Sequence, residues 1–366
     1  MTANDDGARR VVTLSDVAAR ASVSLATASK ALNGRSDVKS TTRARVISAA
    51  EELQFSPNPF ARALLTSQTG TIGMLTSDLD NRFVLPILLG AEDAFGAGAR
   101  SVLLADTRDD VIREQHHLRV LKTKRVDGIL VVGRSTNSRP PIETDGSLPV
   151  VYVYAPCEDP ANASFTPDNV SAGRLAVEHL LGRGRRKIAF LNGDMTYAAA
   201  RERVSGAQAA MMEAGLELVG GVNMYGQWSE SWGRSGAMAL LGGRSNVDAI
   251  IAGNDVLARG VLDAARSIGL RIPAEVAVIG FDNWDILCQD SWPPLTSVDM
   301  NLQELGRRAA GALVDAIGGK RSIGVHLGPV RVVPRDSTAI VDLSERRPFA
   351  KAFTDEAIAI PSEEGT

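Results

Sequence analysis

The stretch that decides the fold is LSDVAARASVSLATASKALNG, which runs from Leu14 to Gly34 near the start of a 366-residue chain. Thr13 and Asp16 stand in a capping-box pattern that opens a helix, and apolar residues follow at helical spacing. The segment ASVS breaks this helix. Ser24 is then positioned to cap a second helix, which we expect to run to about Leu32.

The second predicted helix ends at Asn33–Gly34, because both residues tolerate the left-handed backbone conformation. A third helix is expected from about Ser40–Thr42, with one apolar face made of Val46, Ala49, Ala50 and Leu53. Two short helices joined by a tight turn and backed by a third form a helix-turn-helix. On spacing alone, the alternative is a small helical bundle that binds no ligand.

The second helix has the composition of a helix that enters the major groove of DNA, because it is short and rich in small residues. Ala26 and Ala28 are expected to let the backbone approach phosphates. Hydroxyl groups can donate to phosphates, Lys30 is long enough to reach a base edge, and Leu25 could touch a thymine methyl. The residues expected to contact DNA here are Ser24, Leu25, Ala26, Thr27, Ser29, Lys30 and Asn33.

Charge is distributed unevenly along the chain. Residues 9–70 hold nine basic and four acidic side chains, whereas the whole chain has a net charge of −3. A basic head on an acidic body favours binding of a polyanion by the head. A solvated surface would give the same pattern, so charge alone is a weak indication.

From Thr71 onward, short apolar runs alternate with helix-length segments. Seven of these runs are typical of buried parallel strands: TIGMLTS, SVLLAD, DGILVV, PVVYVYA, KIAFLN, DAIIAG and VAVIGF. The series divides near Phe165–Asn169, which suggests two similar lobes. The predicted fold is therefore an all-α head followed by an α/β body of two doubly wound lobes.

Several classes of protein are disfavoured. No apolar run is long enough to span a membrane, and the opening MTANDDGARR lacks the apolar core of a secretion signal. Cys157 and Cys288 are expected to be reduced thiols, and His116–His117 to lie on a solvated helix face. The chain has no dinucleotide fingerprint, nucleophile elbow or P-loop. We expect a cytoplasmic protein that is not an enzyme and has no cofactor or bound metal.

The motifs TLSDVAARASVSLATASKALNG, VKSTTRARVISAAEELQFSPNPFARAL and the TIG that follows closely resemble the lactose-repressor (LacI/GalR) family of bacterial transcription factors. The resemblance extends in family order from about Val12 to Ile340. It implies that the second helix reads the major groove and that the linker helices of a dimer pair in the minor groove. There a leucine wedges between base steps. Leu64 matches that leucine, and Ala61 and Arg62 match its neighbours.

For the body, the resemblance implies two periplasmic-binding-protein-like lobes, three crossovers and a small effector between the lobes. Arg203 matches the family's cleft arginine and Asp282 its cleft carboxylate, groups suited to paired hydrogen bonds with sugar hydroxyls. Asn254 matches a polar contact, although Asp255 could instead cap the following helix. The full set expected to contact the effector is Phe83, Tyr154, Arg203, Trp228, Asn254 and Asp282.

Alternatives remain open for this set. Arg203 and Asp282 could form a structural ion pair between the lobes, and Trp228 could be a core or lobe-surface residue. Ser22 stands where the turn of the head often has Gly or Asn, at a small cost if its φ is positive. Arg82 stands where family members often have Pro, and Tyr154 where many have Asp. The added cation and aromatic ring could suit an oligosaccharide, an aryl glycoside or an acidic sugar.

The expected organisation follows from these motifs. We predict a disordered N-terminus at 1–10, a helix-turn-helix domain at 11–57, a hinge helix and linker at 58–70, a first lobe at 71–166 plus 299–327, a second lobe at 167–298 plus 328–343, and a disordered tail at 344–366. Helical turns are expected at Phe60–Leu65.

The combination of head and body favours a homodimeric, nucleoid-associated regulator, of the repressor type. It would bind a near-palindromic operator in double-stranded DNA under the control of a sugar or sugar derivative. A sugar-binding protein of the transport type would explain only the body. An α/β enzyme would also explain only the body, and no set of catalytic groups can be identified for it. The sequence does not distinguish an inducer from a corepressor.

Overall fold

The computed structural model describes most of the chain: residues 12–32, 35, 37–55, 68–80, 82–96, 100–144, 146, 148–221, 224–242 and 247–339. Predictions for Asn33, the linker residues Ala61, Arg62 and Leu64, the turns at Phe60–Leu65 and both chain ends lie outside the described residues. In the described part, no helix is long and apolar enough to cross a membrane.

The head contains helices α1 (Leu14–Arg20), α2 (Leu25–Leu32) and α3 (Ser40–Glu52). The predicted capping box is confirmed, because the Thr13 hydroxyl accepts the Asp16 N–H and the Asp16 carboxylate accepts the Thr13 N–H at 2.8 Å. Ser24 caps α2 by accepting the Thr27 N–H at 3.1 Å. In the turn between α1 and α2, Ser22 has a positive φ of 52°.

The three helices of the head enclose their own small core. Val46, Ala49 and Ala50 are buried there, and Leu53 packs against them, which confirms the predicted face of α3. Ala28 also belongs to this core and is fully buried. The expectation that Ala28 lets the helix approach DNA is therefore wrong, since its side chain points inward.

The first lobe, lobe 1, is built on a six-stranded parallel sheet in the order β10-β5-β4-β3-β1-β2. Its strands are β1 (Thr71–Thr76), β2 (Ser101–Asp106), β3 (Gly128–Val132), β4 (Val150–Val153), β5 (Ala163–Pro167) and β10 (Gly324–Gly328). Its helices are α5 (Val84–Phe95), α6 (Val111–Thr123) and α12 (Leu302–Ile317).

The second lobe, lobe 2, has a five-stranded sheet in the order β11-β9-β8-β7-β6, in which only β11 is antiparallel. Its strands are β6 (Ile188–Leu191), β7 (Ala249–Ala252), β8 (Ala277–Phe281), β9 (Thr296–Asp299) and β11 (Arg331–Val333). Its helices are α7 (Asn169–Gly182), α8 (Ala198–Glu213), α9 (Glu230–Leu241), α10 (Asp255–Ser267), the short α11 (Asp285–Gln289) and the 3-10 turn η1 (Asp336–Thr338).

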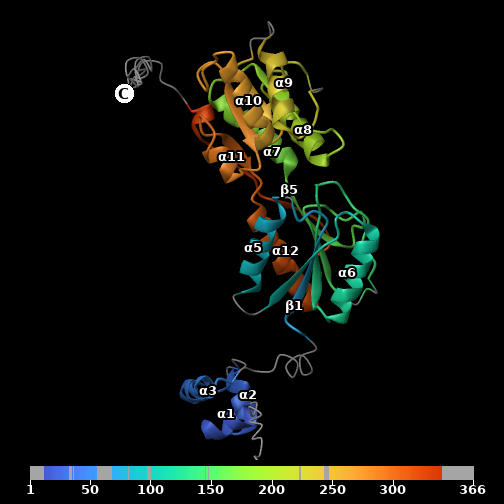
Figure 1. The fold of residues 1–366 in the computed structure, drawn as a ribbon, viewed down its shortest axis with the longest axis vertical. Helices are drawn as coiled ribbons and strands as arrows, with labels where there is room; N and C mark the ends of the chain where they lie inside the picture. The colour runs from blue at the N-terminus through green and yellow to red at the C-terminus, as the bar shows by residue number, and fades with distance from the viewer. Residues whose placement is uncertain are drawn as a thin grey trace, which may run out of the picture.

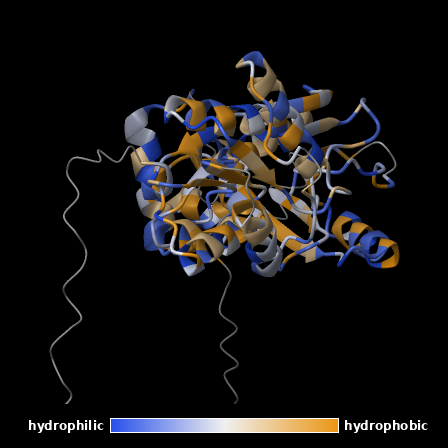
Figure 2. Cartoon of the chain, turned by 90° about the horizontal axis from the view of Figure 1, so that it is seen from above, coloured by the Kyte–Doolittle hydropathy of each residue, from blue (hydrophilic) through white to orange (hydrophobic). Residues whose placement is uncertain are grey.

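The chain passes between the lobes three times: after β5, between β9 and α12, and between β10 and β11. Figure 1 shows the two lobes one beyond the other along the long axis, with α12 returning to lobe 1. The strands inside the body are mostly apolar and the helices around them carry polar outer faces, as Figure 2 shows. All seven predicted runs are strands. The exact domain limits stay a prediction.

Helices α7 and α8 pack unusually closely, and α8 carries Arg203. A Cβ atom at Gly173 would lie 1.9 Å from the Arg203 carbonyl oxygen, and one at Gly206 would lie 1.9 Å from the Val170 carbonyl oxygen. Only glycine fits at these two positions. The backbone of α8 is thereby fixed against α7 at the turn from which Arg203 projects.

Candidate functional site

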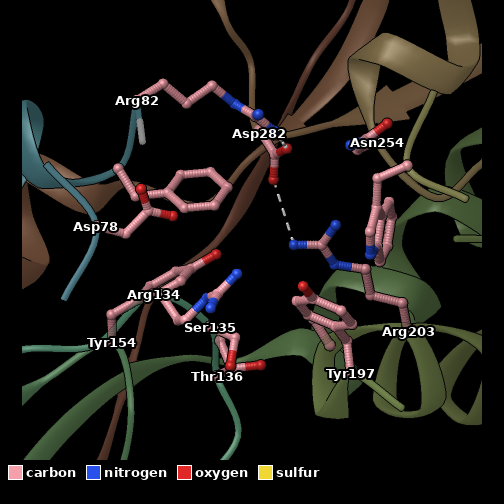
Figure 3. Close-up of a pocket in the computed structure, with 13 residues that line it drawn as sticks. Asp78, Arg82, Arg134, Ser135, Thr136, Tyr154, Tyr197, Arg203, Asn254 and Asp282 are labelled. Atoms are coloured by element: carbon pink, nitrogen blue, oxygen red, sulfur yellow. Dashed lines mark hydrogen bonds and ion pairs between the residues drawn. The ribbon is translucent and has the colours of Figure 1, made fainter. Parts of the chain in front are cut away.

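A cavity with an accessible volume of about 160 Å³ lies between the two lobes. Its lining comes from both sheets and includes all six residues that the sequence predicts as effector contacts (Figure 3). The lining residues are Asp78, Arg82, Phe83, Arg134, Ser135, Thr136, Tyr154, Tyr197, Ala199, Arg203, Trp228, Asn254 and Asp282.

The lining follows from the topology of parallel sheets. Tyr154, Asn254 and Asp282 each come within two residues of the carboxyl end of a strand, and the carboxyl ends of both sheets face the cavity. Five polar residues also line the cavity although they were not predicted as effector contacts: Asp78, Arg134, Ser135, Thr136 and Tyr197. They also follow the ends of β1, β3 and β6, so the same topological rule could have identified them.

Arg203 is held rigidly from three sides. Its Nε donates to Asn169 Oδ1 at 3.0 Å, its Nη1 to the Gly253 carbonyl at 2.7 Å, and its Nη2 to Asp282 Oδ1 at 3.3 Å. The guanidinium also lies over the ring of Phe281, 4.7 Å from its centroid. The residue is only 3% exposed, so its geometry is set before any ligand arrives.

Asp282 joins the two lobes electrostatically. It adopts a positive φ of 95° directly after β8, and one carboxylate oxygen accepts the bond from Arg203. The other oxygen, Oδ2, accepts a hydrogen bond from Arg82 of lobe 1. The alternative interpretation of Arg203 and Asp282 as an ion pair between lobes is right about the pair and wrong about its place, because both residues belong to lobe 2. Arg82 supplies the cation from the other lobe.

Asn254 fills both of the roles that the sequence divides between Asn254 and Asp255. Asn254 caps α10, since its Oδ1 accepts the Leu257 N–H at 2.9 Å, and it also lines the cavity. The expectation that Asp255 could be the cap is wrong. Its side chain is fully buried and accepts hydrogen bonds from the Ser297 hydroxyl at 2.6 Å and the Trp284 N–H at 2.8 Å. Burial, followed by the charge of Asp282, raises the pKa of Asp255 to about 7.

Aromatic rings border the cavity from both lobes. In lobe 1, the centroids of the Phe83 and Tyr154 rings are 4.8 Å apart, and burial raises the pKa of Tyr154 above its usual value. In lobe 2, Tyr197 meets Trp228 edge-on at 5.9 Å. Gly193 admits the Trp228 ring, because a Cβ atom there would lie 2.2 Å from it. Trp228 is partly exposed and lines the cavity, which places it at the site.

Three buried polar atoms around the cavity have no hydrogen-bond partner in the described part of the chain. They are Nε of Arg82, Oγ1 of Thr136 and Nε1 of Trp228. Buried polar groups in proteins are almost always hydrogen-bonded. These three atoms come from both lobes and lie at one cavity, as expected for a site whose polar groups are satisfied by an oxygen-rich ligand.

The predicted DNA-contacting residues of α2 lie mainly on the outside of the head. Leu25 is 54% exposed, and Ala26 is exposed as well. The hydroxyls of Ser24 and Thr27 lie 2.8 Å apart. Lys30 Nζ lies 2.6 Å from Asp37 Oδ2, and this hydrogen bond lowers the pKa of Asp37. Both partners are exposed, so a phosphate or base edge can readily replace the carboxylate.

Comparisons with known proteins agree with this division into head and body. Residues 13–58 match the model for bacterial regulatory proteins of the lacI family, and residues 177–338 match that for a periplasmic binding protein-like domain. The Ribose operon repressor of Escherichia coli (strain K12) is 33% identical over 84% of this chain and 93% of its own. The transcriptional repressor PurR of Aliivibrio salmonicida (strain LFI1238) is 30% identical over 85% of this chain and 93% of its own.

Two solved structures show the same architecture. The lac repressor dimer bound to operator and the anti-inducer ONPF has a TM-score of 0.66 and 27% identity, covering 90% of this chain and 99% of that one. The complex of transcriptional regulator CelR with cellobiose has a TM-score of 0.60 and 28% identity, covering 89% and 99%. From its helix-turn-helix head, its two-lobed body and these relatives, the chain belongs to the LacI family of DNA-binding transcriptional regulators.

Proposed function

We propose that this regulator is a homodimeric repressor whose affinity for a near-palindromic operator is controlled by a sugar-like effector bound between lobes 1 and 2. One observation carries the proposal. The cavity combines a fixed arginine and carboxylate, aromatic rings, and three buried polar atoms that find no partner among the described residues.

These groups suit a polyhydroxylated ring. Aromatic rings cover the apolar faces of such a molecule, a carboxylate accepts hydrogen bonds from its hydroxyls, and a guanidinium donates to their oxygens. Hydroxyl oxygens can also accept from the N–H groups of Arg82 and Trp228. The names of similar proteins point the same way, since one is a ribose operon repressor and another is a complex of the regulator CelR with cellobiose. The proposed contacts are Phe83, Tyr154, Arg203, Trp228, Asn254 and Asp282.

For the operator, we propose that α2 and the linker make the contacts with DNA. Helix α2 would lie in the major groove, and its exposed residues would meet bases and phosphates. Leu64 would wedge into the minor groove beside Ala61 and Arg62. The proposed contacts of α2 are Ser24, Leu25, Ala26, Thr27, Ser29, Lys30 and Asn33.

A second copy of the chain is expected to cover an apolar surface on lobe 1. Leu85 and Leu89 of α5 are 61% and 46% exposed, and Leu103 and Leu104 are exposed on the edge strand β2. The similar lac repressor structure is a dimer bound to its operator. A monomer in sedimentation experiments at micromolar concentration, with and without DNA, would exclude this assembly.

Chromosomal DNA as the partner implies that the protein works in the cytoplasm, at the nucleoid. No catalytic role is proposed, because the relatives are transcriptional repressors. A transport receptor is not favoured, since it would leave the helix-turn-helix head without a role.

A thermal-shift screen with monosaccharides, disaccharides and sugar acids tests the proposal. A ligand that binds only the native state stabilises it by mass action, by about 2.7 kcal/mol at a concentration of 100 Kd. We expect a sugar to raise the Tm of the wild type by a few degrees and to leave that of Arg203→Ala unchanged. If no member of the panel shifts the wild type, the effector is not a sugar.

A further inference from the structure

Arg82 is part of lobe 1, but its side chain contacts residues of both lobes. It lies in the turn between β1 and α5, where its guanidinium stacks over Phe83, 4.4 Å from the ring centroid. Across the lobe boundary it donates to Asp282 and lies 5.1 Å from the centroid of the Trp284 ring. One side chain thus bridges the lobes at the cavity (Figure 3).

This bridge is largely withdrawn from water. The side chain of Asp282 is 4% exposed and that of Arg82 is 22% exposed. Burial opposes the charge of Arg82, yet the carboxylate of Asp282 more than compensates and raises the pKa of the guanidinium. A pair this sheltered is only weakly screened by salt, so it couples the lobes more strongly than an exposed pair would.

Arg82 and Arg203 differ in one respect that points to a ligand. Nε, Nη1 and Nη2 of Arg203 all donate to protein oxygens, whereas Nε of Arg82 is buried and has no acceptor in the part of the chain that the structure describes. Arg82 lines the cavity. An acceptor oxygen on a bound molecule is therefore the group that can satisfy its Nε–H.

We propose that Arg82 is a specificity residue that couples ligand recognition to lobe closure: Nη2 holds Asp282 across the boundary while Nε–H donates to an oxygen of the ligand. This inference rests on the proposed sugar effector and adds to it a requirement, an acceptor oxygen beside Asp282. With the Arg82–Asp282 pair intact, the cavity keeps a volume of about 160 Å³ beside the arginine, so Nε–H can meet a ligand while Nη2 holds Asp282.

Asn137 provides a matched control, because it also joins the lobes. Its Nδ2 donates to the Thr196 carbonyl at 3.2 Å, and its Oδ1 accepts the Ala198 N–H at 2.6 Å. Asn137 is not among the residues that line the cavity. Its removal weakens lobe contact without removing a ligand contact.

The bridge is tested first in the ligand-free full chain by a double-mutant cycle. Arg82→Gln, Asp282→Asn and the double variant are compared with the wild type by thermal unfolding. We expect the double variant to lose clearly less Tm than the two single losses added together, because either change already breaks the bridge. Additive losses would overturn the bridge.

The proposed hydrogen bond from Arg82 Nε–H to a ligand oxygen is tested by calorimetric titration. The probes are D-ribose, D-glucose, cellobiose and monodeoxy analogues of the first two sugars. In the wild type, one deoxy analogue should bind at least fivefold more weakly than its parent sugar. Arg82→Gln should weaken the parent at least fivefold and abolish that difference, whereas Asn137→Ala should keep the order of the analogues.

Two results would refute a hydrogen bond from Arg82 to the ligand. Tighter binding by Arg82→Gln would mean that the arginine competes with the ligand for Asp282. An unchanged order of analogues in Arg82→Gln would mean that Arg82 touches no ligand oxygen. If none of the probes binds the wild type, the proposed sugar effector itself fails, and the cycle without ligand still decides whether the bridge exists.

Discussion

The two lobes contribute to the cavity in different ways. Lobe 2 offers a finished construction, in which Arg203 is bonded to Asn169, Gly253 and Asp282 and is nearly inaccessible. Lobe 1 offers a less complete one, because Arg82 and Thr136 each keep a buried polar atom that has no partner among the described residues, whereas lobe 2 contributes one such atom, Nε1 of Trp228. The difference suggests that lobe 2 supplies a fixed clamp and that lobe 1 supplies the contacts that select a ligand.

The largest effect should come from breaking the clamp. Arg203→Ala removes two hydrogen bonds that we expect to reach sugar hydroxyls, each contributing roughly 1.5–3 kcal/mol for a charged donor. Effector affinity should fall at least about a hundredfold. Calorimetric titration measures it.

Arg201 is the control, because it lies on the same helix but is exposed, and its guanidinium donates to the Met195 carbonyl and does not line the cavity. Arg201→Ala should bind the effector like the wild type. Near-wild-type affinity in Arg203→Ala would remove the clamp from the site and leave Arg203 a purely structural role.

A second expected effect concerns two titratable groups of lobe 2, the buried Asp255 and the partly buried His179, whose pKa values are shifted in opposite directions. The pKa of Asp255 is raised to about 7, and burial lowers the pKa of His179 to about 4. Folding therefore favours protonated Asp255, a contribution that is full at low pH and is lost as pH rises from about 4 to about 7. It favours neutral His179, a contribution that is full above about pH 6.5 and is lost as pH falls toward 4.

When either group is removed by substitution, the pH dependence of stability should be dominated by the group that remains. Asp255→Asn should become more stable as pH rises from 4.5 to 6.5, and His179→Gln should become less stable over the same range. Thermal unfolding at several pH values from 4.5 to 7.5 measures the Tm of each variant. We expect the change of Tm with pH in the wild type to lie between the changes in the two variants. Parallel profiles for the two variants would show that neither group controls stability in this window.

A smaller effect is expected from Tyr154→Phe in lobe 1. This change keeps the ring against Phe83 and removes only the hydroxyl. One hydrogen bond between uncharged groups is worth about 0.5–1.5 kcal/mol, so affinity should fall about two- to tenfold. The titration used for Arg203 applies here as well. A loss as large as that of Arg203→Ala would break the proposed contrast between a clamp and selecting contacts.

Much of both sheets and of the head could be predicted from sequence because the signals are local. The capping box at Thr13, the cap at Ser24 and the seven apolar strands are all present. Strands β5, β9, β10 and β11 were missed. β9 reads TSVD, and its first two polar side chains are buried because partners distant in sequence satisfy them: Thr296 Oγ1 accepts the Arg335 N–H, and the Ser297 hydroxyl donates to Asp255.

The site shows the same limit. Arg203 and Asp282 were identified from motifs, but the partner of Asp282 across the boundary was not. Arg82 lies 200 residues earlier in the chain, and only the three crossovers bring the two together. The unpartnered atoms of Thr136 and Trp228 were equally invisible, because burial and the absence of a partner are properties of packing.

The most direct test of the central claim is linkage between the cavity and the head. An operator selected from random DNA is titrated with the full-length protein, with and without a saturating sugar from the screen. Regulation predicts that the sugar changes the operator Kd of the wild type by at least about fivefold and leaves that of Arg203→Ala unchanged. An operator Kd in the wild type that stays the same while the sugar is bound would contradict control of DNA binding through this cavity.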